Sequence, residues 1–352
     1  MTEQNPVKVG ITGLGRSGWN IHANAIHELP NLFRVVGVCD PAPERQRDAK
    51  DRFGCTTYAE YDDLVKQADI ELMIVATPSN LHNKDVIAAL RCDKDVMVEK
   101  PMASDLAGVD EMISVANTTG RMLTVNQNRR WQPDFLKVRK IIASGVLGRT
   151  IEVRIRSDRF GRRWDWQTLK QYGGGELNNS GAHYIDMGLL LFDDPRPKVF
   201  CHMESTSFYA GDAENHVRVL LTPEAGPLVD VAITTHQSYQ EPSWVVIGTR
   251  GSLVCMGKEI RWKFLSDDTV PPMPLDTKPT HGRKYNQEQL PMTEEIVDLS
   301  DDFNRFSQGH GVLDLYRSLY KTLRHAEPLA ITPESVRRQA AVLEECRKIC
   351  PV

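Results

Sequence analysis

A sequence of 352 residues is too long for one ordinary hydrophobic core and predicts two domains. Its composition, 41% hydrophobic and 26% charged residues, is that of a globular protein in water. The net charge of -4 gives no basic surface for a phosphate backbone and argues against nucleic acid as a partner.

Two further features predict the setting in which the chain works. It contains no apolar run long enough to cross a membrane and no apolar signal segment near its first residue. Its seven cysteines are scattered and never spaced as CxxC, a pattern typical of reduced thiols. We therefore expect a cytoplasmic protein with no membrane partner and no metal site.

The chain opens with an apolar strand, expected at residues 7–12, that stops at a glycine-rich turn and continues as a helix. A second apolar strand at 33–39 ends at Asp40. A GxGxxG turn between a strand and a helix, followed by a strand-terminal acid, is typical of dinucleotide binding. The glycines let the backbone approach a pyrophosphate, and the helix start supplies N–H donors. The turn residues expected at the cofactor are Gly13, Leu14, Gly15, Arg16, Ser17 and Gly18.

The choice of cofactor depends on Asp40. We expect its carboxylate to accept hydrogen bonds from the ribose hydroxyls. Its negative charge would repel a 2′-phosphate, so the sequence favours NAD over NADP. Arg45 and Arg47 follow closely and could turn toward such a phosphate, which keeps NADP as the alternative.

Strands and helices continue to alternate, with strands expected at 71–77, 95–99 and 122–125. This alternation predicts an α/β domain with a doubly wound parallel sheet, a Rossmann domain, over residues 1–127. Ligands bind beyond the carboxyl ends of parallel strands, so the residues after each strand share one rim. Lys100 on that rim is a candidate functional residue, not only a solvated loop charge. The rim residues expected at the cofactor are Asp40, Thr77, Pro78, Asn80, His82, Glu99, Lys100 and Gln127.

The pattern changes after residue 127. A helix at 133–144 is followed by short β-type segments joined by short turns, which predicts a largely antiparallel sheet. We expect an α+β domain over residues 128–352, with the sheet open on one face. The expected strands are 151–155, 199–208, 216–221, 228–235 and 244–262, the last interrupted at 248–251.

Two amphipathic helices are expected near the end of the chain, at 311–324 and 333–348. The polar segment between about 266 and 310 is expected to be a surface loop with isolated helical turns. An antiparallel sheet with one uncovered face commonly pairs with a copy of itself. We therefore expect a homodimer or homotetramer formed through this sheet.

A glycine-rich stretch at 173–175 precedes a helix expected to begin near residue 180. On this helix Ile185, Leu189 and Phe192 recur as an apolar face, while Asn179, His183 and Asp186 recur on another. Taken alone, the second face predicts a cap, a buried histidine and a solvated carboxylate. Placed opposite a rim that carries Lys100, it becomes a candidate for the other half of an active site.

The segment 159–166, just before the glycines, is rich in arginine and tryptophan. Two interpretations stay open: an ordered wall that stacks a sugar ring and binds hydroxyls or a carboxylate, or a packing or inter-subunit segment. The side chains expected to contact the substrate are Asn128, Arg163, Trp164, Trp166, Tyr172, Asn179 and Asp186.

Five marks in this order resemble the Gfo/Idh/MocA family of NAD(P)-dependent oxidoreductases. They are the turn at Gly13 to Gly18, Asp40, the run from Ala76 to His82, Glu99-Lys100-Pro101, and the triple glycine followed by Gly181-x-His183-x-x-Asp186. The resemblance covers residues 7–186 and implies a family but no particular substrate.

The resemblance implies that Lys100 contacts the substrate hydroxyl and the nicotinamide ribose, and that His183 transfers the proton. Many sugar-alcohol dehydrogenases of the family carry Asp four residues before this histidine, where this chain has Asn179. An Asp would raise the pKa of His183 by favouring the imidazolium, whereas an amide offers a hydrogen bond without charge. Our hypothesis is that Asn179 binds a substrate hydroxyl. Asp186 could supply the missing charge or have a structural role.

These residues suit hydride transfer between NAD and a carbinol carbon of a sugar, a cyclic polyol such as inositol, or a sugar derivative. A base near neutrality must take the hydroxyl proton, and a fixed cation should stabilise the alkoxide. One alternative is an NAD-dependent sugar hydrolase or lyase that oxidises its substrate transiently. The other is a non-catalytic NAD-binding regulator, although a regulator does not need the pair Lys100 and His183.

Overall fold

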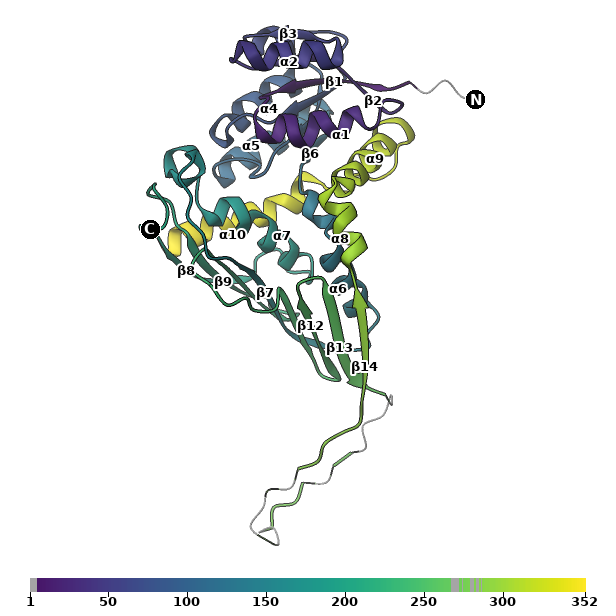
Figure 1. The fold of residues 1–352 in the computed structure, drawn as a ribbon, viewed down its shortest axis with the longest axis vertical. Helices are drawn as coiled ribbons and strands as arrows, with labels where there is room; N and C mark the ends of the chain where they lie inside the picture. The colour runs from purple at the N-terminus through teal and green to yellow at the C-terminus, as the bar shows by residue number, and fades with distance from the viewer. Residues whose placement is uncertain (1–4, 267–271, 274, 279–281, 283–284, 286) are drawn as a thin grey trace.

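A computed structural model describes residues 5–266, 272–273, 275–278, 282, 285 and 287–352, arranged as two stacked domains (Figure 1). The first domain contains a six-stranded sheet with the order β3-β2-β1-β4-β5-β6. All its strand pairs are parallel, which confirms the predicted Rossmann sheet. Its strands are β1 (Val7–Thr12), β2 (Phe33–Cys39), β3 (Thr56–Tyr58), β4 (Leu72–Val75), β5 (Asp95–Val98) and β6 (Leu123–Val125).

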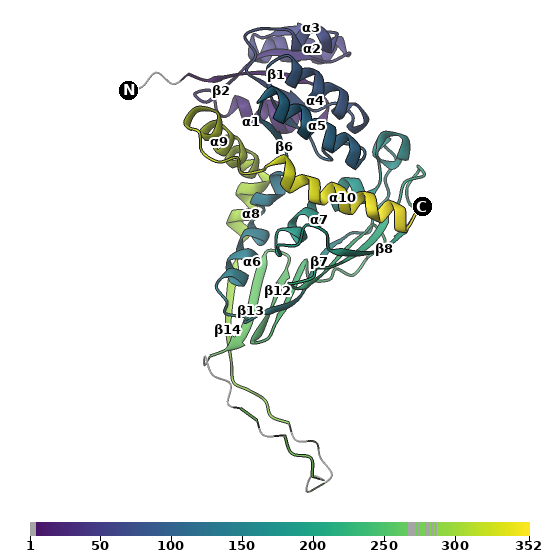
Figure 2. The same cartoon turned by 180° about the vertical axis from the view of Figure 1, so that it is seen from behind.

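Helices lie on both faces of this sheet. Helix α1 is in front of the sheet in Figure 1, whereas α4 and α5 are in front of it in the reversed view of Figure 2. Since both faces are covered, the central strand β4 is apolar along its whole length and every one of its residues is buried. The helices are α1 (Asn24–His27), α2 (Pro43–Phe53), α3 (Tyr61–Val65), α4 (His82–Arg91) and α5 (Leu106–Thr119).

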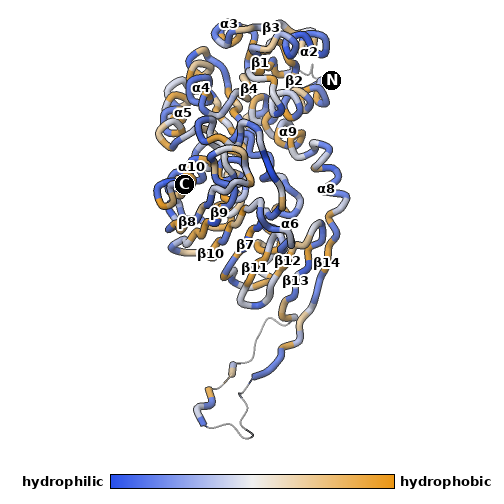
Figure 3. The backbone as a smooth tube through the Cα atoms, turned by 60° about the vertical axis from the view of Figure 1, so that its left-hand side comes forward, coloured by the Kyte–Doolittle hydropathy of each residue, from blue (hydrophilic) through white to orange (hydrophobic). Residues whose placement is uncertain are grey.

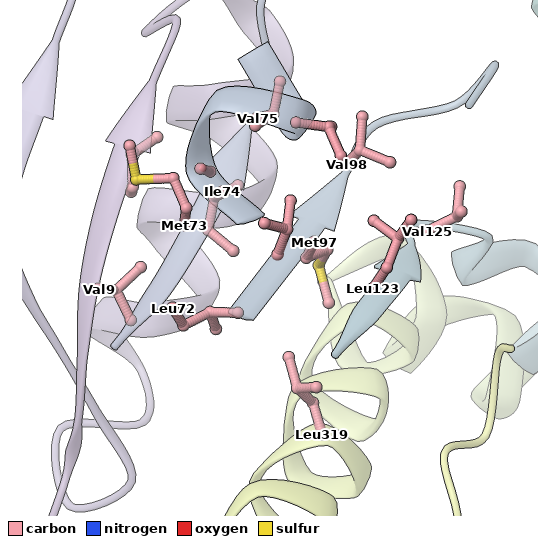
Figure 4. Packing of buried hydrophobic residues seen from close by; sticks show 14 of the residues in the cluster. Val9, Leu72, Met73, Ile74, Val75, Met97, Val98, Leu123, Val125 and Leu319 are labelled. Carbon is pink, nitrogen blue, oxygen red and sulfur yellow. The ribbon is translucent and has the colours of Figure 1, made fainter. Parts of the chain in front are cut away.

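Two helices from the end of the chain return to the first domain. Helix α9 (His310–His325) buries Leu315, Tyr316 and Leu319 in the core of that domain. Figure 4 shows Leu319 beside the side chains of β5 and β6. Helix α10 (Pro333–Ile349) contacts α5 of the first domain and β8 of the second. The predicted division at residue 127 does not capture this packing, because amphipathicity does not specify which core a helix joins.

The second domain contains an eight-stranded sheet with the order β14-β13-β12-β11-β7-β10-β9-β8. Its pairs are antiparallel except for β7 with β10, which confirms the predicted mainly antiparallel sheet. The strands are β7 (Thr150–Asp158), β8 (Lys198–Glu204), β9 (His216–Thr222), β10 (Leu228–Thr234), β11 (Trp244–Gly248), β12 (Gly251–Met256), β13 (Glu259–Leu265) and β14 (Met292–Asp298).

Helices cover one face of this sheet and leave the other open. Along the strands hydrophobic and hydrophilic residues alternate (Figure 3), as expected for a sheet with one solvated face. On the covered face Trp244 stacks on Phe135, with 5.9 Å between the ring centroids. The covering helices are α6 (Pro133–Ala143), α7 (Ala182–Leu189), α8 (Ser300–Ser307) and α10.

The structure corrects the prediction of a loop with isolated turns between 266 and 310. Its last part forms the edge strand β14 and the helix α8. The strand carries no alternating apolar pattern because nearly all its residues are exposed, so periodicity could not reveal it. Other parts of that segment lie outside the described residues. Among the described helices none is long and apolar enough to cross a membrane.

Candidate active site

The glycine-rich turn after β1 lines a cavity of about 750 Å³ at the carboxyl end of the first sheet. Gly13 has φ +82, and a Cβ on Gly18 would lie 1.8 Å from the carbonyl oxygen of Gly13, so both positions require glycine. A Cβ on Gly15 would contact nothing within 4 Å, so the turn leaves open space on that side. The predicted helix start is a π-helical turn, Gly18–Ala23, ahead of a short α1, so the turn itself is the main feature suited to a pyrophosphate.

Asp40 ends β2 and lies in the same cavity. One carboxylate oxygen accepts the N–H of Leu14 at 2.7 Å, and the other accepts the N–H of Ala42 at 2.9 Å. Arg45 donates to Asp40 at 3.3 Å, so in this structure it is paired with the carboxylate. A carboxylate has about four acceptor sites, which leaves capacity for a ribose hydroxyl.

The residues after β4 divide between two roles. Thr77 and Pro78 line the cofactor cavity, whereas Asn80 lines a neighbouring cavity and is not brought to it. His82 lies in the same wall but is 1% exposed, and its ring nitrogens lie 2.9 Å from the carbonyl oxygens of Thr77 and Pro101. It therefore ties two rim turns together. This position explains why burial lowers its pKa.

Glu99 belongs to a buried hydrogen-bond network below the cavity. Its Oε1 accepts from His22 at 2.9 Å and from Asn126 at 2.8 Å, while Tyr316 lies 2.8 Å from the other nitrogen of His22. Burial alone would raise the pKa of Glu99, but these hydrogen bonds and the charge of Lys100 lower it to about 2. The Oδ1 of Asn126 is buried without a partner among the described residues. A polar group of a ligand would satisfy it.

Together these observations fit a bound dinucleotide, with the turn at Gly13 to Gly18 at the pyrophosphate and Asp40 at a ribose. Among the described residues no group of three or more His, Cys, Asp or Glu side chains could hold a metal ion.

Lys100 lies where this cavity adjoins a second one, of about 570 Å³, and it lines both. Its Nζ donates to the backbone oxygen of Asn179 at 2.8 Å, and the Asn179 Oδ1 lies 3.5 Å away. Burial lowers the pKa of Lys100 to about 8, opposed by Glu99 and assisted by Arg129 and Arg16. The ammonium is therefore mostly charged at neutral pH but close to its point of deprotonation.

His183 faces the second cavity from α7. Its Nδ1 lies 2.9 Å from Gln127 Oε1, and the Gln127 amide nitrogen donates to the carbonyl of Ala182 at 3.0 Å. With the amide oriented in this way, Nδ1 carries the proton and Nε2 keeps its lone pair. Burial, followed by the charges of Lys100 and Arg129, lowers the pKa of His183 well below its usual value. His183 is thus a neutral imidazole oriented by Gln127, a residue expected at the cofactor.

Asp186 does not reach either cavity, so the structure does not bring it to the predicted substrate position. Both its oxygens accept from Arg130, at 2.7 and 2.8 Å, and the side chain is 2% exposed. A carboxylate engaged in this way is not solvated and does not orient His183. Of the two roles left open for Asp186, the contact with Arg130 supports the structural one.

Only some of the other side chains expected at the substrate line a cavity. Arg163 and Trp166 line the cofactor cavity, and Asn128 lines the second one. Trp164 and Tyr172 are exposed, at 80% and 40%, and line none of the described cavities. Arg129 and Arg159, which were not among the side chains expected at the substrate, also line the second cavity, and Arg159 begins the predicted wall. Arg129 lies shortly after the end of β6, and that position is the signal that identified the other rim residues, whereas Arg159 directly follows β7 of the second sheet.

Comparisons with known proteins agree with this fold. Residues 7–127 match the oxidoreductase family with an NAD-binding Rossmann fold, and residues 135–254 match the GFO/IDH/MocA C-terminal domain. An uncharacterized oxidoreductase of Schizosaccharomyces pombe is 30% identical over 262 residues, which cover 72% of this chain and 71% of the relative. The scyllo-inositol 2-dehydrogenase (NADP(+)) IolW of Bacillus subtilis is 32% identical over 192 residues, or 54% of each chain.

Among solved structures, the WlbA dehydrogenase from Bordetella pertussis in complex with NADH and UDP-GlcNAcA matches with a TM-score of 0.79. The match covers 99% of this chain and 96% of WlbA at 21% identity, so it supports the fold alone. With the parallel sheet, the glycine-rich turn and both domains matched, the chain belongs to the Gfo/Idh/MocA family of oxidoreductases and carries its NAD-binding Rossmann domain.

Proposed function

We propose that the protein is an NAD(H)-linked dehydrogenase that transfers a hydride between nicotinamide and a carbinol carbon of a sugar, cyclic polyol or sugar derivative. The observation that carries the proposal is that Lys100 and His183, from different domains, line one cavity that adjoins the glycine-rich turn. The inositol dehydrogenases among the relatives support a polyol-like substrate.

Bound NAD supplies the hydride acceptor, and the side chains handle the proton. The free Nε2 of His183 takes the hydroxyl proton of the substrate. The ammonium of Lys100, fixed by Asn179, stabilises the negative charge that develops on the same oxygen. Gln127 keeps the proton of His183 on Nδ1. In this scheme Asn179 positions Lys100 through its backbone oxygen, and its side-chain NH2 group contacts a substrate hydroxyl.

A screen of NAD and NADP reduction at 340 nm over aldoses, inositols, sugar acids and sugar alcohols tests the proposal. We expect turnover on at least one compound, with Lys100→Ala and His183→Ala each lowering kcat/KM by about 100-fold or more. Turnover that survives in both variants would contradict the mechanism. Tightly retained NAD with product formed but no net NADH would favour the transient-oxidation alternative, and NAD binding without any chemistry would favour the regulator.

The pH profile separates the two roles. Lys100 stabilises the alkoxide only while protonated, so alcohol oxidation should fall as pH rises through about 8. His183 is already neutral, so no acid limb should appear near its usual pKa of 6.5. Lys100→Arg keeps the positive charge, so the decline in oxidation rate should shift to higher pH even if kcat is lower. An oxidation rate that instead rises through pH 8 would identify Lys100 as the base.

Cofactor preference follows from Asp40. Asp40→Asn keeps an acceptor for the Leu14 N–H but removes the charge that repels a 2′-phosphate. The ratio of NADPH to NADH dissociation constants, measured by fluorescence titration, should therefore fall by about tenfold. Arg45→Gln is the control, since it leaves Asp40 in place and should preserve the preference for NADH. An unchanged ratio in Asp40→Asn would refute the ribose assignment.

We also propose that the chain forms a homodimer or homotetramer through the open face of the second sheet. That face exposes Phe200, Val254, Met256 and Ile296 around an ion-paired cluster of Arg156, Asp230 and Arg218. Light scattering after size exclusion should give two or four times the chain mass of 39.7 kDa. Val254→Lys should shift the population toward the monomer, and a monomeric wild-type protein would contradict the proposal.

A further inference from the structure

The second cavity, which holds Lys100 and His183, is strongly cationic. Its wall contains four arginines besides Lys100, namely Arg16, Arg129, Arg159 and Arg163. Among the described residues of that wall, Glu99 is the one carboxylate and Ile21 the one aliphatic side chain. No Phe, Tyr or Trp of the described residues lines it, and Trp166 lines the cofactor cavity instead.

Only some of these basic side chains have a carboxylate partner among the described residues. Glu99 is engaged with His22 and Asn126 beneath the cavity. Arg163 pairs with Asp165 at 2.7 Å. Arg16 also lines the cofactor cavity, where an anionic pyrophosphate is expected, so its charge has a separate use.

Arg129 has no carboxylate partner among the described residues, and unlike Arg16 it does not line the cofactor cavity. It donates to the hydroxyl of Tyr184 at 2.7 Å, and its guanidinium carbon lies 5.2 Å from the centroid of that ring. Both contacts orient the side chain without neutralising it. A partly buried cation that lacks a counter-ion is costly unless a ligand supplies one.

Arg159 provides a second, fixed cation in the same cavity. It follows directly on β7, and Glu176 and Tyr209 both contact its guanidinium. Glu176 is fully buried behind it, whereas the Arg159 side chain is 42% exposed. The positive field acts on the site itself, because the charge of Arg129 contributes to the lowered pKa values of both Lys100 and His183.

We propose that the substrate is an anionic sugar or polyol whose carboxylate or phosphate is bound by Arg129 and Arg159 while its reacting hydroxyl lies at Lys100 and His183. This inference rests on the proposed dehydrogenase function and narrows its substrate class. Planar guanidinium groups bind carboxylates and phosphates through paired, charge-assisted hydrogen bonds. A neutral sugar would leave the charge of Arg129 without a counter-ion and would find no Phe, Tyr or Trp side chain of the described residues to stack on in this cavity. The cavity volume of about 570 Å³ lies within the usual range for small-molecule sites.

Matched substrate pairs test the proposal directly. D-glucuronate is compared with D-glucuronamide, and glucose 6-phosphate with glucose, together with other sugar acids, sugar phosphates and their neutral counterparts. We expect kcat/KM for the anionic member of an active pair to exceed that of its neutral match by about 10- to 100-fold. Whether the sugar acids or the sugar phosphates are turned over shows whether the bound anion is a carboxylate or a phosphate.

Variants assign the effect to the two arginines. Arg129→Gln and Arg159→Gln should each lower kcat/KM for the anion by about 10- to 100-fold more than for its neutral match, mainly through KM. Arg129→Lys keeps the charge and should recover part of the loss. Arg34→Gln, an exposed residue on β2, is the matched control and should have no effect.

Binding gives a readout that does not depend on turnover. The anionic member of an active pair should raise the melting temperature of the NADH-loaded protein more than its neutral match, and the difference should disappear in Arg129→Gln and Arg159→Gln. Neutral compounds that turn over as well as the anions, or a preference that both variants retain, would overturn the anionic substrate while leaving the dehydrogenase intact. Absence of hydride transfer with every compound would instead overturn the proposed function on which it rests.

Discussion

The site depends on one constraint: the rim of the first sheet must contact one face of one helix in the second domain. Three rim residues bind four residues of the segment 179–186, through three hydrogen bonds between side chains and two to backbone oxygens. The pairs are Lys100 with Asn179, Gln127 with His183 and Ala182, and Arg130 with Asp186. The deeply buried pair Arg130 and Asp186 anchors the interface, because removing either partner would leave a buried charge alone. The other two pairs place the cation and the base at the same cavity.

Much of this arrangement could be predicted from the sequence, since it follows from periodicity. Parallel strands share a carboxyl edge, so the rim residues were found by reading the ends of apolar runs. The helical face of Asn179, His183 and Asp186 follows from their spacing alone. Periodicity does not show which residue each side chain contacts. Gln127 was predicted at the cofactor and orients the base, while Asp186 was predicted at the substrate and binds Arg130. Both contacts join residues more than fifty positions apart.

Helix α9 illustrates the same limit at a longer range. Its apolar face was visible in the sequence, yet that face completes the core of a domain almost three hundred residues earlier in the chain. Tyr316 from this helix approaches His22, and His22 donates to Glu99, which directly precedes Lys100. Hydrogen bonds donated to Glu99 lower the pKa of its carboxyl group, so the carboxylate stays ionised. Its negative charge in turn favours the ammonium form of Lys100. A helix remote in sequence therefore contributes to the electrostatics of the rim.

Asn179 occupies the position where many family members carry an aspartate, and the structure gives this difference a physical meaning. Its side-chain oxygen lies 3.5 Å from Lys100 Nζ. A carboxylate there would pair with the ammonium, raise its pKa and cancel one positive charge of the cavity. An amide leaves that charge uncancelled, and Gln127, not residue 179, fixes the tautomer of His183. The aspartate is thus unnecessary for orienting the base here. Its absence keeps the cavity cationic, in agreement with a substrate that brings its own negative charge.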